Sequence, residues 1–262
     1  MRQISLQQRI EQAGSQGRVA LIPFITAGFP EPARFPRILR DLDESGADII
    51  EIGIPFSDPV ADGPVVEEAS RQALAMGVTL ERTLKELASL APGLKAGLVL
   101  MGYYNPFLQY GLERLAVDAD AAGVQGLIVP DLPLDEDGPL RAALAPLGLD
   151  LIALVGPNTG DERMRAYAAA ASGYVYVVSV MGTTGVRAEL PAEAADTVRR
   201  ARNAFTLPVA LGFGIHSPEQ IRAMPAPPQA VVFGSALLQH LAAGKPAKDF
   251  MAPWIKPCRA NS

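Results

Sequence analysis

The chain contains few of the residues on which several kinds of chemistry depend. Its single cysteine, Cys258, cannot form an internal disulfide, so we expect an inert thiol and a reducing, cytoplasmic setting. Only two histidines occur, His216 and His240, which excludes a histidine-rich site, and we expect no bound metal. No lysine lies at the C-terminal end of a predicted strand, which argues against Schiff-base catalysis; the lysines are Lys85, Lys95, Lys245, Lys248 and Lys256.

Charge and hydropathy exclude further classes of protein. The formal net charge is −5 and no basic cluster occurs, so nucleic acid is not an expected partner. Hydrophobic residues make up 49% of the chain and charged residues 19%, which is the balance of a globular protein with a large core. The longest apolar runs have the length of strands and are broken by glycine or proline, so no membrane-spanning helix is expected. Residues 1–9 lack the apolar core of a signal peptide.

Strand-like and helix-like segments alternate along the whole chain. Eight apolar runs predict strands, and each is followed by at least one amphipathic segment. No linker divides the series, so residues 1–262 are predicted to form one domain. Eight β–α repeats favour a (β/α)₈ TIM barrel, with an extra N-terminal helix and an extra helix after strand 2. An open dinucleotide-binding sheet would need a glycine-rich turn after the first strand, and residues 27–30 lack that spacing. The predicted strands are 19–26, 48–54, 96–101, 126–129, 150–155, 174–179, 208–211 and 230–233, and the predicted helices are 3–15, 31–45, 65–76, 80–90, 111–122, 137–146, 160–171, 191–203, 217–223 and 235–242.

A carboxylate stands inside the second predicted strand. Glu51 is flanked by isoleucines on a strand that is apolar on both faces, and Asp62 follows in the next loop. An unpaired buried carboxylate is costly, so Glu51 is either paired in the core or retained for chemistry. On the structural alternative, Asp62 is the cap of the helix that begins near Val65.

Three glycine-containing loops follow the sixth, seventh and eighth predicted strands, at the face where TIM barrels carry their active sites. They are residues 180–187, 212–216 and 234–236. Glycine allows backbone N–H groups to approach an anion, and a helix N-terminus adds unpaired donors. The last two loops therefore predict a phosphate site, whereas the first is either a loop that closes over a ligand or a plain surface loop.

The remaining chemistry is acid–base catalysis by carboxylates on a phosphorylated substrate. No nucleophile elbow or Walker loop is present. Phe24, Tyr176 and Phe213 lie near strand ends and indicate that the rest of the substrate is a flat apolar group.

The sequence resembles a known family, the tryptophan synthase α chains. The resemblance extends over nearly the whole chain, and its most specific motif is EIGIPFSDPVADGP at residues 51–64. Further matching segments are PFITAG at 23–28, MGTTG at 181–185, GFGI at 212–215, DLP at 131–133, PN at 157–158 and GS at 234–235.

The resemblance implies cleavage of indole-3-glycerol phosphate to indole and glyceraldehyde 3-phosphate. It implies that Glu51 is the acid–base residue and that Asp62 is its partner. It also implies an α₂β₂ complex in which indole passes to a β chain that carries pyridoxal phosphate, whereas this chain needs no cofactor. By the same resemblance, substrate binding falls to Phe24, Tyr176, Thr184, Gly185, Phe213, Gly214, Gly234 and Ser235, and the contact with the β chain to Asp58, Asn105 and Asp131.

The sequence departs from the commonest pattern of the family at two places, and it leaves two other functions possible. His216 stands where a small polar residue is frequent, and it is either a polar residue at a helix start or a contact of the anion that alters phosphate affinity. Val180-Met181 replaces more polar residues. A related phosphate-binding barrel could instead isomerise a phosphoribosyl anthranilate, or the chain could only modulate a β chain. Glu51 and Asp62 argue against the non-enzymatic alternative.

Overall fold

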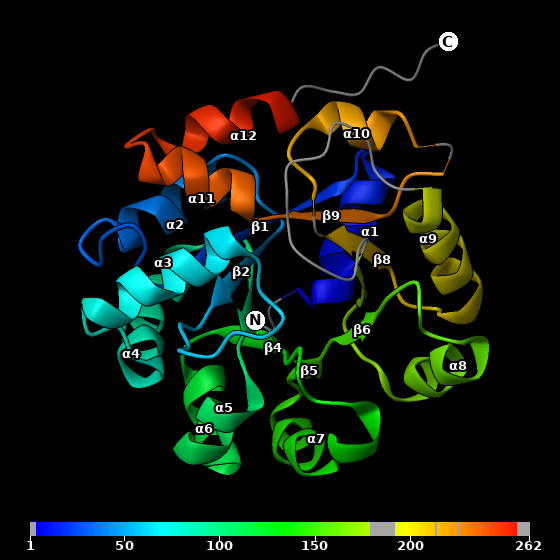
Figure 1. Cartoon of the computed structure of the whole chain (residues 1–262), viewed down its shortest axis with the longest axis horizontal. Coiled ribbons are helices and arrows are strands. Elements are labelled where there is room, and N and C mark those ends of the chain that lie inside the picture. The colour runs from blue at the N-terminus through cyan, green and yellow to red at the C-terminus, as the bar shows by residue number, and fades with distance from the viewer. Residues whose placement is uncertain (1–3, 179–191, 213, 225, 256–262) are drawn as a thin grey trace.

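The computed structural model describes residues 4–178, 192–212, 214–224 and 226–255. Nine strand segments form one parallel sheet in the order β5-β4-β3-β2-β1-β9-β8-β7-β6. β5 and β6 are two parts of one predicted strand, separated only by Ile152, so the sheet closes on itself through a continuous stretch of chain. Figure 1 shows the strands at the centre of a ring of helices. The predicted TIM barrel is therefore confirmed.

The strands are short and nearly all buried, as expected where both faces of a parallel sheet are covered. Their centres match the eight predicted runs, and the fifth run is divided. The strands are β1 Ala20–Thr26, β2 Ile49–Gly53, β3 Gly97–Met101, β4 Val124–Ile128, β5 Asp150–Leu151, β6 Ala153–Val155, β7 Val175–Val178, β8 Val209–Gly212 and β9 Ala230–Phe233.

The helices follow the predicted segments, with two additions that the sequence analysis missed. These are α5 and α12, in segments where prolines at 106, 246 and 253 indicate an interruption. Pro106 is tolerated because it lies in the first turn of α5, where its missing N–H has no helical partner. The helices are α1 Leu6–Ser15, α2 Phe35–Glu44, α3 Pro64–Ala75, α4 Leu80–Leu90, α5 Tyr104–Tyr110, α6 Leu112–Ala121, α7 Gly138–Leu144, α8 Asp161–Ala170, α9 Ala192–Ala204, α10 Pro218–Arg222, α11 Ser235–Ala242 and α12 Ala247–Ile255.

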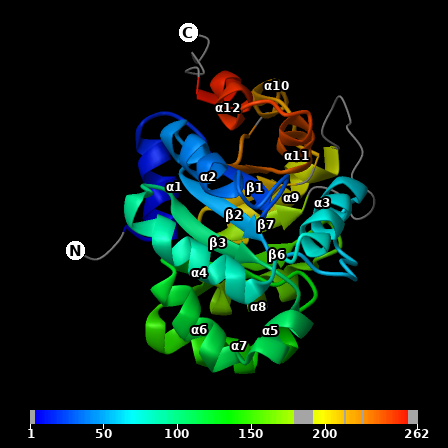
Figure 2. The same cartoon turned by 90° about the vertical axis from the view of Figure 1, so that its left-hand side faces the viewer.

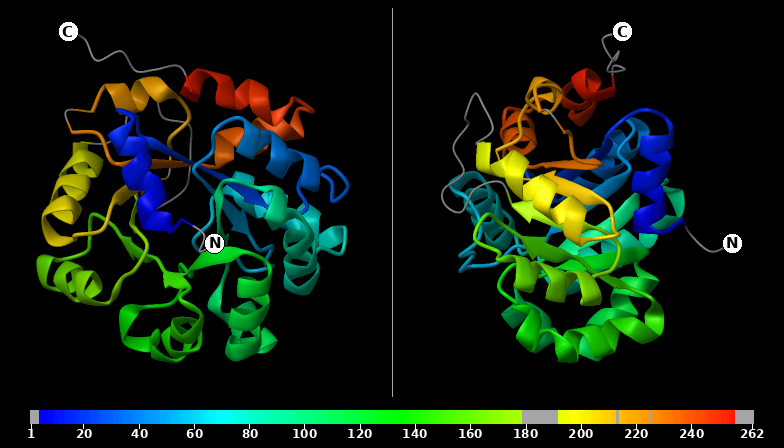
Figure 3. Two further views of the ribbon diagram at one scale, coloured as in Figure 1. Left: turned by 180° about the vertical axis from the view of Figure 1, so that it is seen from behind. Right: turned by 90° about the vertical axis from the view of Figure 1, so that its right-hand side faces the viewer.

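Helix α1 lies across the N-terminal ends of the strands, as the rear view in Figure 3 shows. Leu6 and Ile10 are its buried apolar residues, at 0% and 1% exposure. Gly97 and Gly126 lie beneath Leu6, and an added Cβ on either would come within about 3.0 Å of the leucine side chain. These glycines let α1 pack tightly, which leaves the opposite end of the barrel as the open end.

An ion pair stabilises the chain at this closed end of the barrel. Asp48 precedes β2 and makes a bidentate ion pair with Arg18 at 2.6 and 2.7 Å. The Asp48 carboxylate also accepts the N–H of Leu21 at 2.8 Å, so it ties β1 to β2.

In side view α2, α3 and α4 lie around β1 to β3 on the outside of the barrel (Figure 2). No helix among the described residues has both the length and the apolar content needed to cross a membrane.

Candidate active site

A cavity of about 280 Å³ lies at the C-terminal ends of the strands. It extends from the β2 side of the barrel to the start of α11 on the other side. Seven of the residues predicted from the sequence line it: Phe24, Glu51, Asp62, Tyr176, Gly214, Gly234 and Ser235.

Glu51 occupies the middle of β2, level with Phe24 of β1 and Val99 of β3. The residue is 1% exposed, and its Oε2 atom has no hydrogen-bond partner among the described residues. Burial, together with the nearby Asp62 carboxylate, raises the pKa of Glu51 to about 8. Within the described chain no basic residue pairs with Glu51, so the hypothesis of a paired core charge is not supported.

Asp62 lies in the loop that joins β2 to α3. The cap of α3 is Gly63, and no side chain caps this helix, so the hypothesis that Asp62 is the cap is wrong. Burial raises the pKa of Asp62 to about 7, a hydrogen bond with Tyr103 opposes this rise, and Glu67 adds to it. At neutral pH Asp62 therefore loses its proton more readily than Glu51 does.

Tyr103 was missed by the sequence analysis, although it stands only two residues after the end of strand β3. Its hydroxyl accepts the N–H of Ala61 at 3.0 Å and is hydrogen-bonded to the Asp62 carboxylate. Its ring packs against Phe56, with the ring centroids 5.3 Å apart. An aromatic residue after a buried strand usually belongs to the core, and only the fold brings the hydroxyl to the β2–α3 loop. Tyr103 therefore holds both the backbone and the carboxylate of that loop.

The opposite end of the cavity is rich in unpaired backbone donors. Helix α11 begins at Ser235 after Gly234, and no side chain caps it, so its first N–H groups remain available to an anion. Gly214, in the neighbouring loop, has a φ of +74°, a conformation that glycine adopts without strain. Both loops that predicted a phosphate site thus border the same cavity.

Glycines also make room for the aromatic side chains of the cavity. A Cβ on Gly53 would lie 2.5 Å from the ring of Phe24, and one on Gly234 would lie 2.9 Å from the same ring. A Cβ on Gly212 would lie 2.0 Å from the Tyr176 hydroxyl. Because each neighbouring strand end lacks a side chain, both rings fit at the cavity wall.

Some predicted residues lie elsewhere. Thr184, Gly185 and Phe213 fall outside the described residues. Asp58 lies in the exposed β2–α3 loop, where Ser57 donates to it at 2.5 Å. Asp131 accepts the N–H of Tyr104 at 2.9 Å, so it is joined to the start of α5, where Asn105 is exposed.

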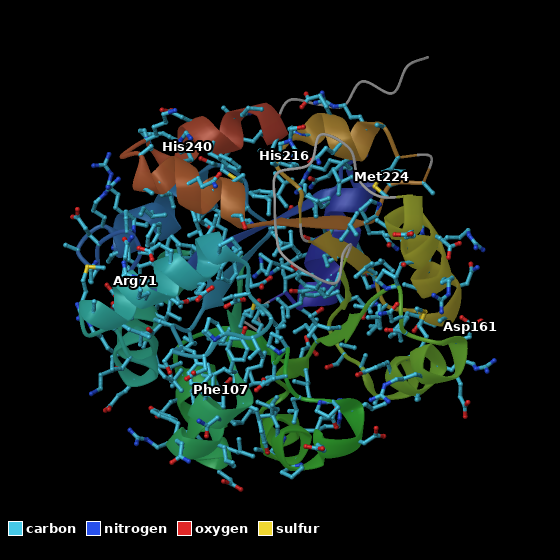
Figure 4. The ribbon with its side chains drawn as sticks, in the orientation of Figure 1. Arg71, Phe107, Asp161, His216, Met224 and His240 are labelled. Atoms are coloured by element: carbon cyan, nitrogen blue, oxygen red, sulfur yellow. The ribbon has the colours of Figure 1, made fainter. Side chains whose placement is uncertain are left out.

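The described residues contain no group of three or more His, Cys, Asp or Glu side chains that could hold a metal ion. His240 belongs to α11, and its ring faces α12 (Figure 4). One ring nitrogen is 2.9 Å from the Pro246 carbonyl oxygen, and the ring packs edge-on against Phe250.

Comparisons with known proteins decide the family. Residues 10–253 match the model of the family described as tryptophan synthase alpha chain. This chain belongs to the tryptophan synthase alpha chain family. A relative of that name from Nitratidesulfovibrio vulgaris strain DP4 is 65% identical over 96% of this chain and 98% of its own. Another, from Solidesulfovibrio magneticus, is 59% identical over 97% and 99%.

Solved structures agree with this assignment. A structure of Mycobacterium tuberculosis tryptophan synthase superimposes with a TM-score of 0.89, at 35% identity over 97% of both chains. The alpha subunit of Legionella pneumophila tryptophan synthase gives 0.84, at 32% identity over 95% of both chains.

Family membership defines the reaction. A tryptophan synthase alpha chain is a carbon–carbon lyase that cleaves indole-3-glycerol phosphate, and its indole goes to the β chain of an α₂β₂ complex. The alpha chain needs no cofactor, because pyridoxal phosphate is carried by the β chain.

The raised pKa of Glu51 has a consequence for stability. The folded protein retains the proton up to about pH 8, whereas the unfolded chain releases it near the ordinary value of 4.5. The contribution of this protonation to stability is therefore complete below pH 4.5 and is lost as the pH rises toward 8. The glutamine of Glu51→Gln cannot titrate. The free energy of unfolding of this variant, relative to that of the wild type, should therefore increase by on the order of 3 kcal/mol between pH 5 and pH 8. Urea unfolding at the two pH values measures this change, with exposed Glu113→Gln as the control. A difference that is independent of pH would contradict a buried, protonated Glu51.

A second prediction concerns Tyr103. Because its hydrogen bond lowers the pKa of Asp62, Tyr103→Phe should raise that pKa and move the rise of kcat/KM to higher pH by roughly one unit. Tyr110→Phe is the matched control. The Tyr110 hydroxyl donates to Asp118 at 2.6 Å, and neither residue lines the cavity. A uniform loss of activity with an unshifted pH profile would show that Tyr103 does not tune Asp62.

Proposed function

We propose that Glu51 and Asp62 perform the cleavage of indole-3-glycerol phosphate in the cavity at the open end of the barrel. The observation that carries this proposal is a fully buried carboxylic acid, Glu51, which faces the same cavity as a second carboxyl group and an uncapped helix N-terminus. The substrate has three matching parts: an acid-sensitive C–C bond, a ring N–H and a phosphate.

The two carboxyl groups have different tasks because their surroundings differ: Glu51 is fully buried, whereas Asp62 has a hydrogen bond with Tyr103 that lowers its pKa. Asp62, with the lower pKa of about 7, is the group that ionises first, and it accepts a hydrogen bond from the indole N–H. Glu51, with a pKa of about 8, retains its proton and donates it to indole C3. Protonation places positive charge on the ring system, and the Asp62 carboxylate stabilises this charge.

Cleavage then returns the proton to Glu51. The Glu51 carboxylate takes the proton of the hydroxyl group on the carbon attached to C3, and a carbonyl forms there. The electrons of the broken C–C bond return to the indole ring. One proton is donated and one is recovered, so Glu51 ends in its starting state and no metal or cofactor takes part.

The rest of the cavity binds and orients the substrate. The backbone N–H groups of Gly214, Gly234 and Ser235 hold the phosphate, and Phe24 and Tyr176 line the indole end. Thr184, Gly185 and Phe213 are proposed to complete the site.

The contact with the β chain is proposed to involve Asp58, Asn105 and Asp131. Their surroundings support a docking surface, because Val60 beside Asp58 and Leu108 on α5 are 84% and 50% exposed. We further propose that residues 1–262 form one domain and that the chain works in the cytoplasm. The unbroken alternation of strands and helices supports the single domain, and a biosynthetic role supports the cytoplasm.

The catalytic roles can be tested by indole release. Glu51→Gln should lower kcat at least 100-fold while substrate still binds, because proton transfer typically contributes a factor of 10² or more. Asp62→Asn should lose most of the activity through weaker charge stabilisation. Indole formation from indole-3-glycerol phosphate is measured with and without added β chain. Turnover near that of the wild type in either variant would remove that residue from the mechanism, and a rearranged ribulose product in place of indole would point to the isomerase.

The docking surface makes a separate prediction. Leu108→Asp should weaken binding to the β chain at least tenfold, measured by calorimetry, and leave indole release by the chain alone unchanged. Val117→Asp on α6 is the control, since Val117 is similarly exposed at 58%. Equal effects of the two changes would exclude α5 as a specific contact.

A further inference from the structure

The cavity has an uneven distribution of ionisable groups. Among the described residues that line it, Glu51 and Asp62 are acidic, His216 is the single basic side chain, and no lysine or arginine occurs. The phosphate group of the substrate carries about −1.5 to −2 charges near neutral pH. Backbone donors and a helix dipole stabilise such an anion only in part. His216 is therefore the one residue of the described lining that can supply a positive charge.

His216 is held in place at the anion end of the cavity. It follows Gly214 and Ile215 in the loop after β8, and all three residues line the cavity together with Ser235 of α11. In Figure 4 His216 lies between α10 and α11. The backbone N–H of His216 donates to the side chain of Gln220 at 2.8 Å. The loop is thus anchored to α10, and the ring has a defined position.

The ring contact sets which nitrogen can bind a ligand. Nδ1 of His216 is 3.2 Å from the carbonyl oxygen of Gly214, and a carbonyl can only accept, so Nδ1 carries a hydrogen in this contact. Nε2 is then the remaining ring nitrogen, and it donates to a phosphate oxygen only when the ring is an imidazolium.

The surrounding charges do not replace this role. The α11 residues that line the cavity, Ser235, Ala236 and Gln239, are uncharged. On α10, Glu219 forms an ion pair with Arg222 at 3.1 Å. The other two ionisable residues of the lining, Glu51 and Asp62, are acidic and supply no positive charge.

We propose that His216, as an imidazolium, donates from Nε2 to the phosphate of the substrate and supplies the positive charge at that end of the cavity. This proposal rests on the proposed function, which assigns the phosphate to the loops at Gly214 and Gly234. His216 is a binding residue and takes no part in proton transfer at indole. It distinguishes phosphorylated from unphosphorylated ligands.

The test compares two inhibitors in the complex of the full chain with its β chain. Formation of glyceraldehyde 3-phosphate is followed at steady state, with glycerol 3-phosphate as the phosphorylated inhibitor and indole as the unphosphorylated one. His216→Ser should raise both KM for indole-3-glycerol phosphate and the inhibition constant of glycerol 3-phosphate about tenfold. The inhibition constant of indole and kcat should stay within about twofold of the wild type. His216→Lys restores a positive charge without the Nδ1 contact, so it should recover most of the affinity for glycerol 3-phosphate.

Other outcomes overturn the proposal. Unchanged inhibition by glycerol 3-phosphate would show that His216 does not bind the phosphate. Equal weakening of both inhibitors would show that His216 only stabilises the loop. A His216→Lys variant that behaves like His216→Ser would show that a positive charge at this position does not contribute to phosphate binding. His240→Ser is the matched histidine control, because His240 lies outside the cavity lining. A wild-type complex that forms no glyceraldehyde 3-phosphate would instead contradict the proposed function.

Discussion

The burial of the Glu51 carboxyl group without a positive partner among the described residues is the constraint on which the site depends. A carboxylate in this environment is destabilised, and the group keeps its proton to about pH 8. A salt bridge at the same position would stabilise the charged form and remove the acid. The protein therefore loses stability as the pH rises from about 4.5 to about 8, and it keeps inside an apolar barrel a carboxylic acid that the proposed mechanism uses as the proton donor. Asp62, nearer the surface and bonded to Tyr103, ionises more readily.

The cavity also depends on where side chains are missing. Gly53 and Gly234 border the ring of Phe24, and Gly212 borders the hydroxyl of Tyr176. Strand ends in a closed barrel lie about 5 Å apart, so a large ring fits between them only where a neighbour has no Cβ. Gly234 also leaves the backbone at the start of α11 accessible to an anion. Glycine thus makes room for the aromatic wall and for the proposed phosphate end.

The barrel could be predicted from the sequence because each strand is a short apolar run and each main helix has an amphipathic stripe. The division of the fifth strand at Ile152 could not be predicted, since it depends on how the two edges of the sheet meet. Helices α5 and α12 were missed because prolines at 106, 246 and 253 resemble breaks. Glu51 and Asp62 stood out as acids in a buried motif, whereas Tyr103 resembled an ordinary core aromatic residue. Its contact with the Asp62 loop crosses between two strands and leaves no local signal in the sequence.

Helix α1 closes one end of the barrel through Leu6 and its contacts with Gly97 and Gly126. Among the described residues, the cavity proposed as the reaction chamber therefore opens at the C-terminal ends of the strands, where the substrate would enter and both products would leave. The phosphorylated product carries charge and is released into water at little cost, whereas indole is apolar and gains by entering another apolar surface. A partner that covers this open end of the barrel receives the indole before it can diffuse into bulk solvent.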